Sequence, residues 1–155
     1  MMSLPSLRIL VVDDQEDMRF LVVCLLEIAG AKVRSFESAD QALEAFVRWK
    51  PDVIVSDIMM PEHDGYWFLW HIRQLEPEQG RETPAIALTC LTSDEDRARA
   101  LSAGFQIHMG KETMFDDLVS AVRTLTGCAT FDPEKHENRP TAPTSWPGRN
   151  KPGRS

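Results

Sequence analysis

The sequence predicts an α/β fold in which helices cover both faces of a doubly wound, five-stranded parallel sheet. Short apolar runs alternate with longer stretches of helical periodicity, and this alternation occurs five times before residue 130. Such alternation is typical of strand–helix–strand units, which form parallel sheets. With 155 residues, 43% of them hydrophobic, the chain is long enough for one hydrophobic core but short for two domains.

Five runs have the composition expected of strands. Each is four or five residues long and is followed by polar or turn-forming residues. The predicted strands are residues 8–12, 32–36, 53–56, 85–88 and 105–109.

Capping and stop residues mark the predicted helices. Ser38 and Ser93 each precede a Gln or Asp by three residues, which is the spacing of a capping box at a helix N-terminus. Gly30 and Gly104 are expected just past helix ends, because glycine readily adopts the left-handed conformation that closes a helix. The predicted helices are residues 16–29, 39–50, 66–75, 94–103 and 115–125. The last one carries an apolar stripe at helical spacing, formed by Phe115, Leu118, Val119, Val122 and Leu125.

Composition divides the chain into a folded body and a tail. From residue 130 onward, five prolines stand among Gly, Asn, Thr and Arg with few apolar residues, which is typical of disorder. We therefore expect an N-terminal extension at residues 1–6, one domain at residues 7–128 and a disordered, proline-rich tail at residues 129–155. The tail has five basic and three acidic residues, so the formal charge of −7 for the chain becomes −9 for residues 1–129. Such an acidic body gives no electrostatic reason to expect direct contact with nucleic acid.

The cysteines and the N-terminus indicate the compartment. Cys24, Cys90 and Cys128 are far apart and odd in number, so they suggest neither a disulfide framework nor a metal motif. Residues 1–6 lack the basic and apolar regions of a secretory signal, and no apolar run reaches the length of a membrane-spanning helix. We expect a cytoplasmic protein without membrane association.

Chemically active side chains follow four of the five predicted strands. Asp13 and Asp14 come directly after the first strand, and Asp57 comes after the third. Thr89 follows the fourth strand, and Lys111 lies shortly after the fifth. Ligands of doubly wound sheets bind at the carboxyl ends of the strands, so we expect these side chains to meet at one edge.

Three carboxylates at one edge would repel one another unless a cation joined them. Hard oxygen ligands favour Mg²⁺, which commonly binds through one or two carboxylates and a phosphate. A carboxylate such as Asp57 can attack phosphorus and form an acyl phosphate, while Thr89 and Lys111 hold the phosphoryl oxygens. These residues therefore predict a Mg²⁺-dependent phosphoryl-transfer site without a separate general base.

Four stretches together resemble the receiver domain of two-component response regulators, over about residues 7–125. They are VVDD at residues 11–14, SDIMMPEHDG at residues 56–65, LT at residues 88–89, and the single Lys111. The resemblance implies a flavodoxin-like (βα)5 fold, as in chemotaxis regulators, with strand order 2-1-3-4-5.

The same resemblance implies roles for the residues of the site. Asp57 is the phosphoacceptor, and its donor is a phosphohistidine on a sensor histidine kinase or phosphotransfer protein. Asp14 and Asp57 bind Mg²⁺ directly, Asp13 binds it through water, and Met59 contributes a backbone carbonyl. The output is expected to be a protein contact on the surface of the fourth helix, fifth strand and fifth helix. In the family this surface serves for homodimerisation or partner binding, and the sequence does not identify the output protein.

Some positions depart from the family pattern. Thr89 and His108 occupy the positions of the family's switch pair, in which the second residue is usually Tyr or Phe, and His108 is expected to move inward when Thr89 turns toward the phosphate. Glu112 stands where the family usually has proline, so the lysine-bearing loop is expected to differ in shape. Met59 and Leu91 flank the phosphate in the family and are both apolar here. They cannot activate a hydrolytic water, which favours a long-lived phosphoryl state.

Other hypotheses stay open beside a regulator whose output is a protein contact. The chain also fits a receiver fragment of a hybrid kinase or multidomain regulator, or a phosphorylation-independent interaction module. A small Mg²⁺-dependent phosphatase would need a further acid or base, and none is evident. A nucleotide or flavin binder is disfavoured because the first loop is acidic rather than Gly-rich. The four aromatic residues within 66–70 exceed one helical face, so Trp67 or Trp70 is a candidate docking patch.

Overall fold

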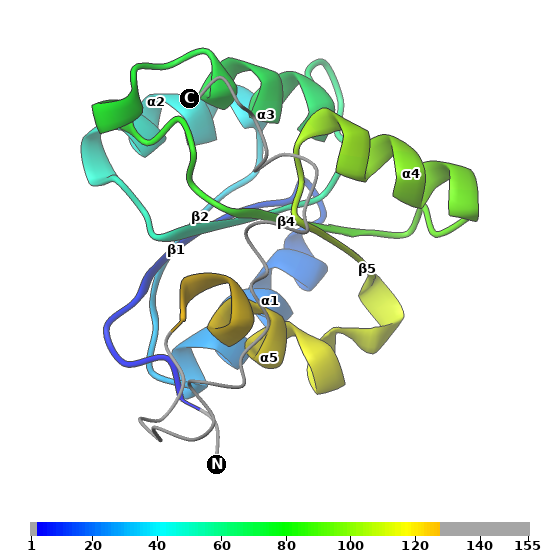
Figure 1. The fold of residues 1–155 in the computed structure, drawn as a ribbon. Helices are drawn as coiled ribbons and strands as arrows, with labels where there is room; N and C mark the ends of the chain where they lie inside the picture. Colours follow the sequence, from blue (N-terminus) through cyan, green and yellow to red (C-terminus); the bar gives the residue numbers. More distant parts are fainter. Residues whose placement is uncertain (1–2, 128–155) are drawn as a thin grey trace.

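The computed structural model describes residues 3–127, which form a single sheet with helices around it (Figure 1). The strand order is β2-β1-β3-β4-β5, and every pair of neighbouring strands is parallel. The strands are β1 (Arg8–Val12), β2 (Lys32–Phe36), β3 (Val53–Ser56), β4 (Ala85–Thr89) and β5 (Ile107–Gly110). The predicted fold class and strand order are confirmed.

Helices cover both faces of this sheet (Figure 1). The helices are α1 (Glu16–Ile28), α2 (Ala39–Trp49), α3 (Gly65–Arg73), α4 (Asp94–Ala103) and α5 (Met114–Thr126). On one face lie α1 and α5, and on the other lie α2, α3 and α4. No helix within residues 3–127 is long and apolar enough to cross a membrane.

The sheet has a separate apolar core on each face. Along β1, Ile9 and Val11 pack in the core under α1 and α5, whereas Leu10 and Val12 pack in the core under α2 and α3. Successive side chains of a strand point to opposite faces, so a strand covered on both sides needs apolar residues at every position. The polar residues that follow such a strand are therefore held at the edge of a rigid sheet.

Local capping sets the helix boundaries. The hydroxyls of Ser38 and Ser93 each accept a hydrogen bond from the backbone N–H three residues later, at 3.2 and 3.0 Å, as the sequence predicts. Helix α3 begins one residue earlier than predicted because Asp64 caps it. The Oδ1 atom of Asp64 accepts a hydrogen bond from the backbone N–H of Trp67 at 2.9 Å. This bond satisfies a donor that the first turn of the helix leaves unpaired.

Strand β5 begins two residues later than predicted, because Phe105 belongs to the end of α4. Gly104 closes that helix with a φ of 117°. The backbone N–H of Phe105 then donates to the carbonyl of Ala100 at 3.1 Å, a bond typical of a Schellman helix end. The Phe105 side chain is thereby buried beside α3 and α4.

Two apolar side chains lie where the sequence did not place them. Leu4, within the expected N-terminal extension, is fully buried in the core under α1 and α5, and its backbone N–H donates to the carbonyl of Ala29 at 2.6 Å. Phe115, expected in the apolar stripe of the last helix, is 61% exposed, because Met114 takes the buried position at the start of α5. The expected tail at residues 129–155 lies outside the described residues.

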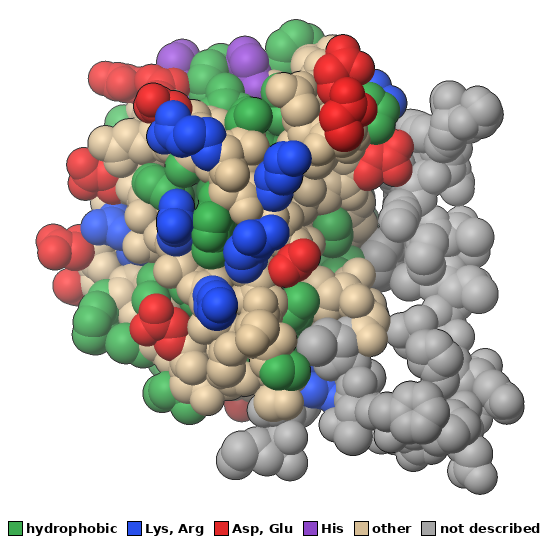
Figure 2. Space-filling model, turned by 90° about the vertical axis from the view of Figure 1, so that its left-hand side faces the viewer, with side chains coloured by type: hydrophobic (Ala, Val, Ile, Leu, Met, Phe, Trp, Pro, Cys, Tyr) green, Lys and Arg blue, Asp and Glu red, His purple; other side chains and the backbone are tan. Residues whose placement is uncertain are grey.

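Basic side chains gather on one side of this acidic domain. Figure 2 shows that side, the left-hand side of Figure 1, where several Lys and Arg side chains lie close together. Among the described residues, the edge strand β2 carries exposed Lys32 and Arg34, and the guanidinium groups of Arg8 and Arg34 lie 5.9 and 4.8 Å from the ring centre of Trp49. Charged side chains on an edge strand prevent unwanted pairing with other strands.

Candidate functional site

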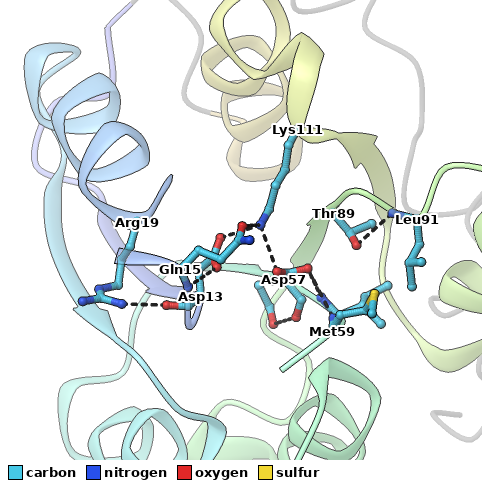
Figure 3. Close-up of polar contacts among 10 residues, drawn as sticks. Asp13, Gln15, Arg19, Asp57, Met59, Thr89, Leu91 and Lys111 are labelled. Atoms are coloured by element: carbon cyan, nitrogen blue, oxygen red, sulfur yellow. Dashed lines mark hydrogen bonds and ion pairs between the residues drawn. The ribbon is translucent and has the colours of Figure 1, made fainter. Parts of the chain in front are cut away.

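Four polar side chains are buried together at the carboxyl edge of the sheet (Figure 3). Asp13, Asp57, Thr89 and Lys111 are 3%, 5%, 0% and 6% exposed. Asp14, next to them in sequence, is exposed to solvent. The structure thus brings together the residues that the sequence predicts at this edge, and the site opens to solvent on the side of Asp14.

Backbone contacts fix the carboxylate of Asp57. Its backbone N–H donates to the carbonyl of Val12 at 2.9 Å, which extends the pairing of β1 and β3 past the end of β3. Its Oδ1 atom accepts hydrogen bonds from the backbone N–H groups of Ile58, at 2.6 Å, and Met59, at 3.3 Å. Two amides on one oxygen fix the orientation of the carboxylate and leave Oδ2 for other partners.

The start of α3 packs tightly against the backbone of this aspartate. The backbone N–H of Gly65 donates to the carbonyl of Ile58 at 2.8 Å. A Cβ atom on Gly65 would overlap the backbone carbonyl of Asp57, so only glycine fits this approach. The Asp-Gly pair at residues 64–65 therefore serves both to cap α3 and to hold the loop that follows Asp57.

The Lys111 ammonium lies between two carboxylates. Lys111 begins a short 3₁₀ turn, Lys111–Thr113, directly after β5. Its Nζ atom lies 2.9 Å from Oδ2 of Asp57 and 3.0 Å from Oδ2 of Asp13. A third acceptor, Oε1 of Gln15, lies 2.8 Å away. The three N–H donors of the ammonium thus have three oxygen partners.

Burial and ion pairing shift two pKa values in this cluster. Burial raises the pKa of Asp13 above its usual value, although hydrogen bonds from the backbone of Gln15 and from Lys111 act in the opposite direction. Burial alone would lower the pKa of Lys111, but its hydrogen bonds to Asp57 and Asp13, together with the negative charges of these two groups, outweigh burial and raise it. Lys111 therefore remains a cation at neutral pH.

The three aspartates lie close enough together to hold one divalent cation. One carboxylate oxygen each from Asp13, Asp14 and Asp57 lies within 4.8 Å of the others. Carboxylate oxygens are the ligands that Mg²⁺ prefers, and the exposed Asp14 leaves room for the water molecules that Mg²⁺ retains. Met59 lies at the same edge, with an exposed side chain and a backbone N–H bonded to Asp57. The donor set fits a hard cation.

The two predicted switch residues meet at Leu91. The Thr89 hydroxyl accepts a hydrogen bond from the backbone N–H of Leu91 at 3.2 Å (Figure 3). Nε2 of His108 lies 2.7 Å from the backbone carbonyl of the same residue. His108 is 8% exposed, so the residue is buried in this structure.

An open groove of about 700 Å³ adjoins the site. It runs from Asp14 past the apolar side chains of Met59 and Leu91 to Arg99. The Arg99 guanidinium lies 4.3 Å from the ring centre of Tyr66, which forms part of the groove wall. Solvent and small molecules can reach the aspartates by this route.

Two further residues, Gln15 and Arg19, hold the site together, and the sequence analysis did not single them out. Gln15 contacts Lys111, and its own backbone N–H donates to Oδ1 of Asp13 at 2.9 Å. Nη1 of Arg19, one turn into α1, donates to the backbone carbonyl of Asp13 at 2.8 Å. Asp side chains commonly accept a hydrogen bond from the backbone N–H two positions later. This tendency was a sequence signal that could have indicated Gln15.

Comparison with known proteins identifies the family. The family model of the response regulator receiver domain matches residues 9–123. The chain belongs to this family. Among solved structures, a receiver domain of Francisella response regulator 1452 is 28% identical, with a TM-score of 0.72, and the match covers 79% of this chain and 98% of that one. A response regulator receiver domain protein from Clostridium thermocellum is 26% identical, with a TM-score of 0.70 over 79% and 95% of the two chains.

Curated relatives of this receiver domain differ widely in size. An uncharacterised 14.6 kDa protein of Leptolyngbya boryana is 38% identical, and the match covers 86% of this chain and 99% of that protein. Hybrid signal transduction histidine kinase D of Dictyostelium discoideum is 35% identical over 79% of this chain but only 8% of its own length. Transcriptional regulatory protein TrcR of Mycobacterium tuberculosis is 34% identical over 77% of this chain and 45% of its own. The chain thus spans less than half of the last two relatives.

Proposed function

We propose that this receiver domain accepts a phosphoryl group on Asp57 from a sensor histidine kinase or a phosphotransfer protein. The observation that carries the proposal is the setting of the Asp57 carboxylate. Oδ1 is held by two backbone amides, Oδ2 lies 2.9 Å from the Lys111 ammonium, and two further carboxylates lie beside it. A buried carboxylate with a fixed cation and a metal-binding cluster is suited to form an acyl phosphate.

The proposed transfer is a direct displacement at phosphorus. A carboxylate oxygen of Asp57 forms the new O–P bond while the N–P bond of the donor phosphohistidine breaks, and the imidazole nitrogen keeps the bonding electron pair. Lys111 and the Thr89 hydroxyl then hold phosphoryl oxygens. No general base is needed, because a carboxylate nucleophile has no proton to lose when it attacks.

We assign the metal site to the aspartate cluster. Asp13, Asp14 and Asp57 are the proposed side-chain ligands, with the backbone carbonyl of Met59 as a further one. When bound, Mg²⁺ supplies neutralisation of the negative charge on the transferring phosphoryl group. In its absence Lys111 balances the charges of Asp13 and Asp57, which explains how these carboxylates are accommodated while buried.

The proposed output is a change in a protein-interaction surface. To reach a phosphoryl oxygen, Thr89 must release the backbone N–H of Leu91, whose carbonyl is bonded to His108 on β5. The rearrangement would therefore reach the surface formed by α4, β5 and α5, where a second copy of the chain or an output protein binds. The apolar side chains of Met59 and Leu91 beside the site favour a long-lived phosphoryl state. We place this signalling step in the cytoplasm.

A second candidate is a receiver unit that works within a larger signalling protein. The 35% identity to a hybrid histidine kinase, of which the chain spans 8%, favours it. The two candidates share the same chemistry at Asp57. They differ in the direction in which the phosphoryl group is transferred between the proteins of a relay.

The test is phosphorylation by a small donor. The chain is incubated with acetyl phosphate and Mg²⁺, and its intact mass is measured beside Asp57→Asn. The variant keeps the size of the side chain and removes the nucleophilic charge. One phosphate per chain, dependent on Mg²⁺ and lost in the variant, is expected. An unlabelled wild type under conditions that label a known receiver would contradict the proposal and favour a phosphorylation-independent interaction module.

A further inference from the structure

We propose that Gln15 is a positioning residue for phosphoryl transfer, which it assists by holding the Lys111 ammonium against Asp57. This inference rests on the proposed function, since it assigns a role within the same site. Gln15 contacts no reacting atom in the structure, and its effect passes through Lys111.

The contact between Gln15 and Lys111 is direct and short. Oε1 of Gln15 lies 2.8 Å from Nζ of Lys111, the shortest of the three contacts of this ammonium. Figure 3 shows Gln15 and Asp57 approaching the ammonium from different elements, the start of α1 and the end of β3. The lysine head is therefore held between two parts of the fold rather than by the aspartates alone.

Gln15 is itself fixed by its place in the chain. It is the residue preceding α1, with extended backbone angles of φ −87° and ψ 113°. Its backbone N–H donates to Oδ1 of Asp13, and its carbonyl accepts from the N–H of Arg19 at 2.9 Å. Arg19 in turn donates a side-chain hydrogen bond to the backbone of Asp13. The side chain of Gln15 thus extends from a backbone that is bonded on both sides.

The need for such an anchor follows from the chemistry at the aspartates. The other two partners of Lys111 are Oδ2 atoms of Asp13 and Asp57, and both carboxylates are proposed to bind metal or phosphorus. As those oxygens take new partners, the ammonium loses acceptors. Gln15 keeps its amide oxygen throughout, so it holds Lys111 in place while the carboxylates change partners. A long lysine side chain loses considerable rotamer entropy when it is ordered. Because Gln15 already holds the ammonium in place, less of this entropy is lost during the transfer step itself.

The test uses two variants at this position and one matched control. Gln15→Leu keeps the bulk of the side chain and removes the acceptor, whereas Gln15→Glu keeps an acceptor oxygen at the same reach. Gln74→Leu makes the same change at an exposed glutamine just past the end of α3. For each full chain we would measure the phosphorylation rate against acetyl phosphate concentration, and separately the dissociation constant for Mg²⁺ by calorimetry.

We expect Gln15→Leu to lower the maximal rate of phosphorylation, and Gln15→Glu, which retains an acceptor oxygen, to restore it. The low end of the range for one hydrogen bond to a charged group corresponds to about a tenfold fall in maximal rate for Gln15→Leu, and we expect Mg²⁺ affinity to stay within about twofold of wild type. Gln15→Glu and Gln74→Leu should both remain within about twofold of the wild-type rate.

Three results would overturn the inference while the wild type is still phosphorylated. The first is Gln15→Leu reacting at the wild-type rate. The second is Gln15→Glu losing as much rate as Gln15→Leu, which would show that the acceptor oxygen is not the reason. The third is a loss of Mg²⁺ affinity equal to the loss of rate, which would make Gln15 part of the metal site. An unphosphorylated wild type is a different result, because it removes the proposed function and this inference with it.

Discussion

Replacement of Lys111 by methionine tests the electrostatic balance of the site. Methionine fills nearly the same volume but carries no charge, so Asp13 and Asp57 lose the cation that lies 3.0 and 2.9 Å from their oxygens. Removing one partner of a buried ion pair typically costs roughly 3–5 kcal/mol, because a buried charge is left without compensation. Here the exposed Asp14 opens the site to water, so we expect a loss of about 2–3 kcal/mol in the free energy of unfolding without metal.

Magnesium should reverse much of this loss. In the wild type a metal ion must take carboxylate oxygens that Lys111 already holds, whereas in Lys111→Met it meets no competing cation. If the dissociation constant for Mg²⁺ is about tenfold lower in the variant, saturating Mg²⁺ stabilises the variant by about 1.4 kcal/mol more than the wild type. The difference in the free energy of unfolding between wild type and Lys111→Met should therefore fall to about half when EDTA is replaced by Mg²⁺.

The assay is urea unfolding followed by circular dichroism, in EDTA and in excess Mg²⁺. Lys32→Met, at an exposed position on the edge strand β2, serves as the control and should change the free energy of unfolding by less than about 0.5 kcal/mol. A variant as stable as the wild type in EDTA would refute the view that Lys111 compensates the buried carboxylates. An equal gain from Mg²⁺ in both proteins would refute competition between the lysine and the metal.

Three further substitutions test other parts of the structure. Leu4→Ala should lower the free energy of unfolding by about 3 kcal/mol in urea, because it empties a fully buried position, and a change below about 1 kcal/mol would show that the N-terminal segment does not pack on the domain. Asp64→Ala removes the cap of α3 and should cost about 1 kcal/mol in the same assay, and an unchanged midpoint would contradict the capping role. Thr89→Val keeps the shape of the side chain but removes its hydroxyl, so we expect phosphorylation by acetyl phosphate to slow about tenfold. A wild-type rate for Thr89→Val would exclude contact between that hydroxyl and the phosphoryl group.

The overall fold was predictable because its determinants are local. A strand covered on both faces must be apolar throughout, and a helix lying on a sheet must repeat at helical spacing, so both patterns are readable along the chain. Capping residues such as Ser38 and Ser93 marked helix starts for the same reason. The errors had two sources: Leu4 packs against segments distant in sequence, whereas Phe105 is placed by a hydrogen bond within the end of its own helix. Phe105 was assigned to a weakly signalled fifth strand, but a helix-ending hydrogen bond from its backbone N–H to the carbonyl of Ala100 controls its position.

The convergence of the site residues was predictable for a topological reason. In a parallel sheet the carboxyl ends of all strands share one edge, so residues that follow different strands must come together there. Asp13, Asp57, Thr89 and Lys111 are separated widely in sequence and are nevertheless buried at that edge. Gln15 could not be assigned in this way. Its role depends on the direction of a side chain within the site, and residue type and strand position do not determine that direction.

The environment of the His108 side chain could not be predicted from the residue type at that one position. The place of His108 on β5 was recognised from the family's switch pair, and inward movement was expected when Thr89 turns toward the phosphate, although the imidazole is smaller than the usual Tyr or Phe ring. In the structure the ring is already buried, because Nε2 has a partner in the carbonyl of Leu91 at 2.7 Å. A buried imidazole nitrogen needs such a partner, and a carbonyl acceptor requires the hydrogen to be on Nε2. The Thr89 hydroxyl binds the N–H of the same leucine, so a displacement of this one residue alters both bonds. The two switch positions are therefore connected through the backbone of Leu91. The residue types at positions 89 and 108 do not indicate this connection.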